Sequence, residues 1–130
     1  MEPRAYRSKG TVVVIDDHDA TLHFLKEALT HLGYTPLAAK GGAKGVELCR
    51  TYDVDLVLTD YYMPKMSGLD LLRAVRQDSA AHYKNVPFII ITSGVEDSVC
   101  QEVVNLGISH LLFKPFGTEQ LTEILAKIFR

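Results

Sequence analysis

Short apolar runs alternate along this chain with longer stretches in which apolar residues recur at helical spacing. Except for Tyr34–Ala39, the runs are rich in branched aliphatic residues and uninterrupted, which is typical of strands buried on both faces of a sheet. They are Val12–Ile15, Tyr34–Ala39, Leu56–Leu58, Phe88–Ile91 and Leu111–Phe113. Each is followed by a helical stripe: Leu22, Leu25, Leu29 and Leu32; Ala43, Val46 and Cys49; Leu69, Leu72 and Val75; Val99, Val103 and Leu106; Leu121, Ile124, Leu125 and Ile128. Five such units predict an α/β fold with a doubly wound parallel sheet and right-handed crossovers.

Start and stop signals support these elements. Gly33 and Gly107 follow the first and fourth helical stripes, as expected of left-handed caps. Ser67 with Asp70 three residues later has the spacing of a capping box. Pro36 cannot donate to a sheet ladder, so its strand is expected at an edge.

The remaining segments are predicted to be a tail, a loop and a turn. Residues 1–10 are expected to form a flexible tail and residues 11–130 a single domain. Residues 78–85 are mostly polar and predict a long loop. Gly41–Gly45 superficially resembles a phosphate-binding loop but lacks its Gly-Lys-Ser/Thr ending, and we interpret it as a turn.

Composition narrows the function classes. The net charge of −2 gives no broad basic field, which argues against binding of nucleic acid or an anionic membrane. No apolar run approaches the ~18 residues of a membrane span, and the first ten residues lack a secretion signal, so a cytoplasmic location is expected. Cys49 and Cys100 are not in a CxxC pair, and we expect both to be reduced and structural.

Polar residues of particular kinds end four of the apolar runs. They are Asp16 and Asp17, Asp60, Thr92, and Lys114. In open α/β sheets ligands bind outside the carboxyl ends of the strands, so these side chains are expected to meet at one edge.

Three carboxylates at that edge require a cation. Two unit charges ~5 Å apart at an effective dielectric of ~20 repel by roughly 3 kcal/mol. An all-oxygen site suits Mg²⁺, which commonly joins carboxylates to a phosphate group. A lysine and a hydroxyl beside one carboxylate could stabilise a phosphoryl group, with the carboxylate as nucleophile. The histidines lack zinc-ligand spacing and are interpreted as surface or partly buried structural residues: His18, His23, His31, His82 and His110.

Four segments together resemble the receiver domain of two-component response regulators. Val12–Asp17 resembles the family's first strand with its acidic pair, and Leu58–Gly68 resembles the phosphoacceptor segment with proline and glycine at the family's spacing. Ile91–Ser93 and Phe113–Pro115 resemble the other two signatures. Each segment alone is a weak signal, but all four in order, over about residues 10 to 130, are highly specific.

The resemblance implies a flavodoxin-like sheet of order 2-1-3-4-5 with five helices. It also implies that Asp60 accepts a phosphoryl group from a phosphohistidine on a histidine kinase or phosphotransfer protein. Mg²⁺ would be bound by Asp17, Asp60 and the backbone carbonyl of Tyr62, with Asp16 acting directly or through water.

Thr92 and Lys114 would contact the phosphoryl oxygens, and the Lys114–Pro115 peptide is expected to be cis. The implied function is a phosphorylation-controlled switch that assists its own phosphotransfer and dephosphorylation but is not an enzyme. Phosphorylation would change the surface of the fourth helix, fifth strand and fifth helix, where a downstream protein binds.

Three positions depart from the family pattern. Leu111 stands where many receivers have an aromatic residue, which puts the usual inward swing of that residue in doubt. Ser93 replaces a common alanine, and the bulk of Tyr62 favours slow dephosphorylation. Leu111 and Phe113 are otherwise expected in the core.

Other function classes remain open. A phosphohydrolase of the haloacid-dehalogenase type needs a second aspartate where Tyr62 stands. A flavin or dinucleotide module needs a glycine-rich first turn, whereas this chain has an acidic one. A phosphorylation-independent adaptor with a receiver fold is the main alternative, and the domain is either a stand-alone receiver or part of a larger regulator or hybrid kinase.

Overall fold

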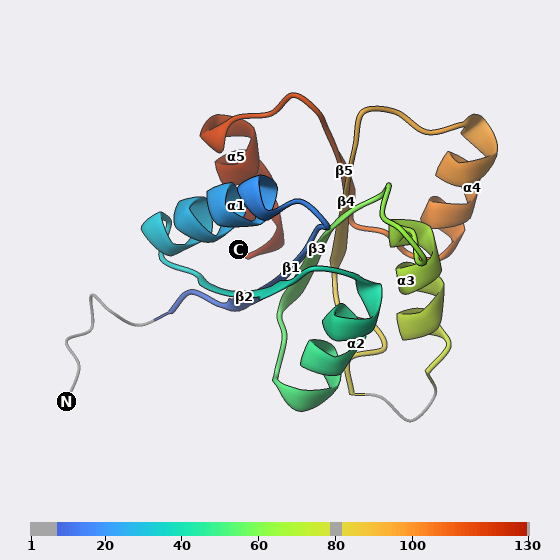
Figure 1. The fold of residues 1–130 in the computed structure, drawn as a ribbon, viewed down its shortest axis with the longest axis horizontal. Coiled ribbons are helices and arrows are strands. Elements are labelled where there is room, and N and C mark those ends of the chain that lie inside the picture. The colour runs from blue at the N-terminus through green and yellow to red at the C-terminus, as the bar shows by residue number, and fades with distance from the viewer. Residues whose placement is uncertain (1–7, 79–81, 130) are drawn as a thin grey trace.

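The computed structural model describes residues 8–78 and 82–129 and contains a five-stranded parallel sheet flanked by helices (Figure 1). In chain order the elements are β1 (Thr11–Ile15), α1 (Asp19–His31), β2 (Thr35–Ala39), α2 (Gly42–Thr51), β3 (Leu56–Asp60), α3 (Gly68–Arg76), β4 (Phe88–Thr92), α4 (Asp97–Asn105), β5 (His110–Phe113) and α5 (Thr118–Ile128). The strand order is β2-β1-β3-β4-β5 with every pair parallel, which confirms the predicted fold and order.

Helices cover the sheet on both faces. Figure 1 shows α1 and α5 on one side and α2, α3 and α4 on the other. Alternate residues of one strand therefore belong to different cores: Val12 and Val14 pack with α1 and α5, whereas Val13 and Ile15 pack on the opposite face. This two-sided burial is why the central strands are continuously apolar in sequence.

The predicted end signals are confirmed. Gly33 and Gly107 have φ angles of 98° and 77°, in the left-handed region that favours glycine. Ser67 caps α3, and its hydroxyl and the Asp70 carboxylate each accept a backbone N–H from the other residue. Pro36 lies in β2, which is an edge strand.

The second helix begins where a turn was predicted. α2 starts at Gly42, so the interpretation of Gly41–Gly45 as a turn is wrong. Gly42 and Gly45 are buried, while Ala43, predicted to face the core, is exposed. A Cβ atom on Gly45 would lie 2.3 Å from Cδ1 of Ile15, so the absence of side chains lets the helix approach β1 closely.

The fifth strand is less buried than expected. Phe113 is 54% exposed, so its assignment to the core is wrong. β5 is an edge strand and only Leu112 is buried in it, because the single neighbouring strand leaves part of its surface uncovered. Leu111 is half-buried and packs against the core of the α2, α3 and α4 face.

Part of the expected tail is fixed to the domain. Residues 1–7 lie outside the described residues, but the Lys9 amide donates to the Gly33 carbonyl at 2.9 Å, and the Thr35 amide donates to the Gly10 carbonyl at 2.8 Å. In the predicted loop, residues 79–81 are not described and Tyr83 is buried. Among the described residues, no helix has the length and apolar character needed to cross a membrane.

Candidate functional site

The predicted acidic residues meet at the carboxyl end of the sheet. β1 pairs with β3 so that Ile15 lies opposite Thr59, which brings Asp16 beside Asp60. One ligand atom each from Asp16, Asp17, His18 and Asp60 lies within 4.8 Å of the others. The prediction that the three carboxylates converge is therefore confirmed.

Asp16 and Asp60 are buried, Asp17 is partly exposed, and all three carboxylates are incompletely paired. Asp16 is fully buried and Asp60 is 2% exposed. Among the described residues, Asp16 Oδ2 has no hydrogen-bond partner, and the nearest basic groups to Asp17 Oδ1 and Asp60 Oδ1 are the His18 ring and the Lys114 ammonium, at 3.2 and 3.1 Å. Buried carboxylate oxygens without donors are costly unless a cation offsets them, and an oxygen-only set matches the preference of hard cations such as Mg²⁺. The residues present thus fit a divalent metal site.

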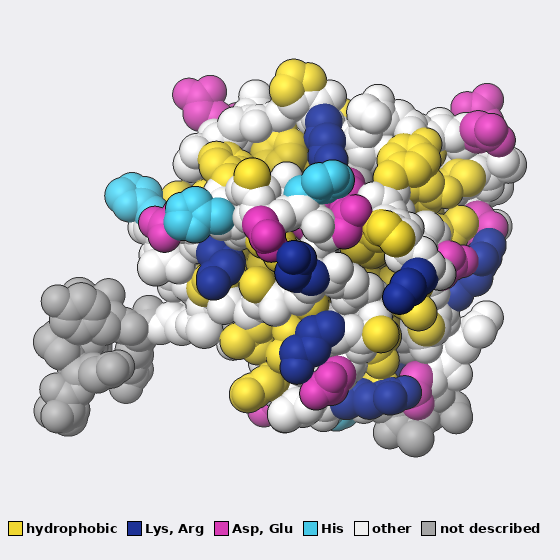
Figure 2. Space-filling view, viewed as in Figure 1, with side chains coloured by type: hydrophobic (Ala, Val, Ile, Leu, Met, Phe, Trp, Pro, Cys, Tyr) yellow, Lys and Arg dark blue, Asp and Glu magenta, His cyan; other side chains and the backbone are white. Residues whose placement is uncertain are grey.

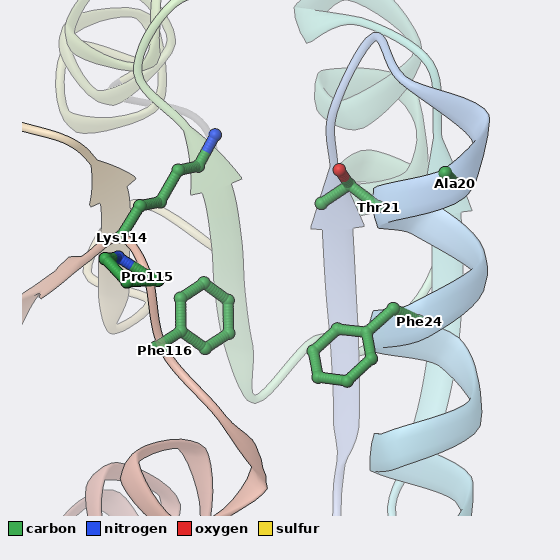
Figure 3. A pocket seen from close by; sticks show the side chains of 6 residues that line it. All are labelled: Ala20, Thr21, Phe24, Lys114, Pro115 and Phe116. Carbon is green, nitrogen blue, oxygen red and sulfur yellow. The ribbon is translucent and has the colours of Figure 1, made fainter.

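Lys114 provides positive charge at the same place. Its Nζ atom lies 3.1 Å from Asp60 Oδ1, within ion-pair distance. The Lys114 amide donates to the Thr92 carbonyl, and the following peptide to Pro115 is cis, as predicted. In Figure 3 the Lys114 nitrogen points away from Pro115, toward the end of β3.

The charge balance at Asp60 is set mainly by burial. Burial raises the pKa of Asp60 above its usual range, and the charges of Asp16 and Asp17 add to the rise. The Lys114 ammonium opposes it. Burial and the neighbouring negative charges destabilise the ionised form of Asp60, and a nearby cation would stabilise it. The site is therefore suited to a metal ion or to a group that brings one.

Thr92 lies at the site but its hydroxyl is bonded within its own loop. Thr92 is fully buried at the end of β4. Its Oγ1 donates to the Gly94 carbonyl at 3.1 Å and accepts from the Gly94 amide at 3.1 Å. The hydroxyl is therefore near the acidic residues in the fold but has a local partner.

Tyr62 reaches across the mouth of the site. Its side chain is 59% exposed and stands two residues beyond Asp60. The hydroxyl donates to the Gly94 carbonyl at 3.2 Å, and the ring packs edge-on against Tyr61 with centroids 4.7 Å apart. The loop after β3 is thereby joined to the loop after β4.

Close backbone packing holds the phosphoacceptor-like segment in shape. The Gly68 amide donates to the Tyr61 carbonyl at 2.9 Å. A Cβ atom on Gly68 would lie 2.8 Å from the Asp60 carbonyl oxygen, so only glycine fits there without displacement. Lys65, in the same loop, has a positive φ of 69°. The glycine at the family's spacing thus has a steric reason in this chain.

His18 is exposed, as the sequence indicated, but its ring also lies against the acidic residues, a contact that the sequence did not predict. Its Nδ1 atom lies 3.1 Å from Asp16 Oδ1 and 3.2 Å from Asp17 Oδ1. The His18 amide also donates to Asp16 Oδ1 at 2.8 Å, which forms a local turn. The signal available was its position directly after the acidic pair, where such a turn brings the ring back toward the carboxylates.

An apolar cleft borders the site. It has a volume of about 420 Å³ and is lined by residues of α1 and of the segment after β5: Ala20, Thr21, Phe24, Lys114, Pro115 and Phe116. The rings of Phe24 and Phe116 lie on opposite sides of it in an edge-to-face arrangement, with centroids 6.2 Å apart (Figure 3). On the face shown in Figure 2, some acidic and His side chains lie near the middle with Lys and Arg side chains around them, and others stand at the left and upper edges.

Comparisons with known proteins agree with this geometry. A family model for the response regulator receiver domain matches residues 12–126. The chain is 32% identical to a probable chemotaxis protein CheY of Rhizobium etli, over 93% of each chain. It is 30% identical to the hybrid signal transduction histidine kinase D of Dictyostelium discoideum, over 88% of this chain but 7% of that protein. The structure of CheY4 of Vibrio cholerae superposes with a TM-score of 0.84 at 27% identity, covering 92% of this chain and 98% of that one.

Proposed function

Because this chain belongs to the response regulator receiver domain family, a class of signalling switches rather than classical enzymes, we propose that it is switched by phosphorylation of Asp60. The donor is a phosphohistidine on a histidine kinase or phosphotransfer protein. The phosphorylated form presents a changed surface to a downstream protein.

The observation that carries the proposal is the environment of Asp60. Asp60 is 2% exposed and borders two other carboxylates, and an ammonium lies 3.1 Å from one of its oxygens. This environment suits a carboxylate that accepts a phosphoryl group while a cation neutralises the added charge. Transfer of a phosphoryl group needs little from a protein beyond positioning and charge neutralisation. Asp60 is the nucleophile in this proposal, and Lys114 neutralises charge on the incoming group.

A Mg²⁺ ion fits the oxygen atoms left without donors. Asp16, Asp17 and Asp60 would hold it, together with the backbone carbonyl of Tyr62. When bound, the metal supplies charge neutralisation to the phosphoryl oxygens. The carboxylates of Asp16 and Asp17 would hold the metal next to Asp60, where it would offset negative charge.

Thr92 links the site to the surface. A phosphoryl group adds about −1.5 to −2 charges and strong acceptor oxygens, which compete with the Gly94 carbonyl for the Thr92 hydroxyl. Movement of Thr92 and Lys114 toward these oxygens would rearrange the neighbouring surface of α4, β5 and α5. The exposed Phe113 and Val104 lie on these elements and are available to a downstream protein.

Intact mass tests the proposal. Incubation with Mg²⁺ and acetyl phosphate is expected to add the mass of one phosphoryl group to the wild-type protein and nothing to Asp60→Asn. Asp53→Asn is a matched control, because Asp53 is exposed and lies outside the acidic cluster. The absence of an adduct at every Mg²⁺ concentration would favour a phosphorylation-independent adaptor.

A further inference from the structure

The loop after β4 forms hydrogen bonds at Gly94 with side chains of two strand ends. Gly94 has a positive φ of 149°, and a Cβ atom added there would meet nothing within 4 Å. The space beside its Cα atom is therefore open. The contacts that fix Gly94 are hydrogen bonds to two hydroxyl groups, those of Thr92 and Tyr62.

Both hydroxyls use the same carbonyl oxygen. Thr92 Oγ1 donates to the Gly94 carbonyl at 3.1 Å, and the Tyr62 hydroxyl donates to it at 3.2 Å. A carbonyl oxygen has two lone pairs, so it accepts both bonds at once. Tyr62 comes from the loop that carries Asp60, so the shared carbonyl connects the phosphoacceptor loop to the residue expected to sense phosphorylation.

We propose that Tyr62 is a positioning residue for Thr92: through Gly94, its hydroxyl holds the loop in the arrangement in which the Thr92 hydroxyl is bonded to Gly94. The inference rests on the proposed function, in which Thr92 leaves Gly94 for a phosphoryl oxygen on Asp60. That departure breaks both Thr92 bonds to Gly94 and moves the loop. The Tyr62 bond opposes the movement and so favours the unphosphorylated arrangement.

The hydroxyl and the ring of Tyr62 have separate roles in this proposal. The ring packs against Tyr61, whereas the hydroxyl alone reaches Gly94. Tyr62→Phe keeps the ring and removes the bond. Tyr61→Phe is the matched control, because among the described residues the Tyr61 hydroxyl makes no hydrogen bond.

The first measurement is the affinity for beryllofluoride, a phosphoryl mimic, in the presence of Mg²⁺. Tyr62→Phe removes the solvent-accessible hydrogen bond from the tyrosine hydroxyl to Gly94, which stabilises only the unphosphorylated arrangement. The variant is therefore expected to bind beryllofluoride about two- to fivefold more tightly than wild type. Tyr61→Phe is expected to bind as the wild type does. Unchanged or weaker binding by Tyr62→Phe would overturn the proposal.

A double-mutant cycle tests whether the effect passes through Thr92. In Thr92→Val the hydroxyl that must leave Gly94 is already absent, so adding Tyr62→Phe is expected to leave the affinity unchanged. If Tyr62→Phe tightens binding equally in both backgrounds, Tyr62 acts independently of Thr92 and the proposal is wrong. A merely structural role of the tyrosine would give that additive result.

Amide hydrogen exchange separates this inference from the proposed function. In free protein without Mg²⁺ or mimic, the Gly94 amide is expected to exchange about two- to fivefold faster in Tyr62→Phe than in wild type or Tyr61→Phe, because the loop has lost one restraint. Unchanged exchange would overturn the inference even if Asp60 is phosphorylated. A different outcome would be that no protein binds beryllofluoride while the Gly94 amide still exchanges faster in Tyr62→Phe. That result would contradict the proposed function but would support the role of Tyr62 in holding the loop.

Discussion

At the scale of single residues, Gly45 determines how closely α2 approaches the sheet. A Cβ atom there would lie 2.3 Å from Cδ1 and 3.0 Å from Cγ1 of Ile15, which is itself fully buried. Gly45→Ala should gain helix propensity of about 1 kcal/mol but force Ile15 to move within a packed core. We expect a net loss of about 1–2 kcal/mol in the free energy of unfolding, measured by urea denaturation.

A second substitution in the same contact provides the control. Ile15→Val removes the Cδ1 atom that the new methyl group would meet, at a cost of about 0.5–1.5 kcal/mol by itself. The double variant should therefore be more stable than the sum of the two single losses predicts. Strict additivity would show that the methyl group introduced by Gly45→Ala is accommodated without the predicted clash.

The site residues that could be located from sequence alone are reactive polar residues that stand at the end of a predicted strand. Asp16, Asp60 and Thr92 each follow or end an apolar run, so strand geometry places them at one edge. The contact of His18 was missed because a turn, rather than a strand end, brings its ring to the carboxylates. Phe113 was misplaced because its apolar character suggested burial like that of the central strands, whereas β5 lies at the sheet edge and leaves this residue 54% exposed.

At the scale of elements, Arg76 joins α3 to the end of α4. Its Nε, Nη1 and Nη2 atoms donate to the carbonyls of Leu106, Lys84 and Gly107, at 2.8, 2.8 and 3.1 Å. The guanidinium also lies over the Phe88 ring, 5.3 Å from its centroid. Arg76→Met keeps much of the apolar stem but leaves three carbonyls without this donor, so we expect a loss of about 2–3 kcal/mol in unfolding free energy.

Arg73 is the matched control for this prediction. It also leads from α3 to α4, where it pairs with Glu102, but both side chains are about two-fifths exposed. Water can replace such a surface pair, so Arg73→Met should cost about 1 kcal/mol or less. Equal losses for the two variants in urea denaturation would contradict the claim that the Arg76 carbonyl contacts anchor α4.

Elements with strong periodicity were predicted better than those that depend on close packing. The buried strands and α1, α3 and α5 were evident from apolar spacing and from Gly33 and Ser67. The start of α2 was not evident from the sequence. Glycines usually indicate a turn, and they are expected inside a helix only where a neighbouring side chain leaves no room for a Cβ atom. That steric limit comes from Ile15 and Met66, which lie far from α2 in sequence.

At the scale of the whole molecule, the sheet concentrates negative charge at one edge. The ends of β1 and β3 bring Asp16, Asp17 and Asp60 together, and Lys114 is within ion-pair distance of one of them. Repulsion among these carboxylates lowers the free energy of unfolding, and packing elsewhere must offset it. A bound divalent cation would turn this destabilising contribution into a stabilising one, so the metal should affect global stability as well as phosphorylation.

Thermal or urea unfolding with and without Mg²⁺ measures this coupling. Wild-type protein should gain stability as Mg²⁺ is added, by about 2.7 kcal/mol at a concentration 100 times the dissociation constant. Asp17→Asn should be more stable than wild type without the metal, because one repelling charge is gone, and should respond little to its addition. Asp19→Asn is the control: Asp19 is 82% exposed and pairs with Lys40 at 3.0 Å, outside the cluster, so its response to Mg²⁺ should match that of wild type. If Mg²⁺ stabilised wild type, Asp17→Asn and Asp19→Asn equally, the metal would have to bind elsewhere on the surface. Asp17 and Asp19 are only two residues apart, so only a site that uses the Asp17 carboxylate would make Asp17→Asn respond differently from Asp19→Asn.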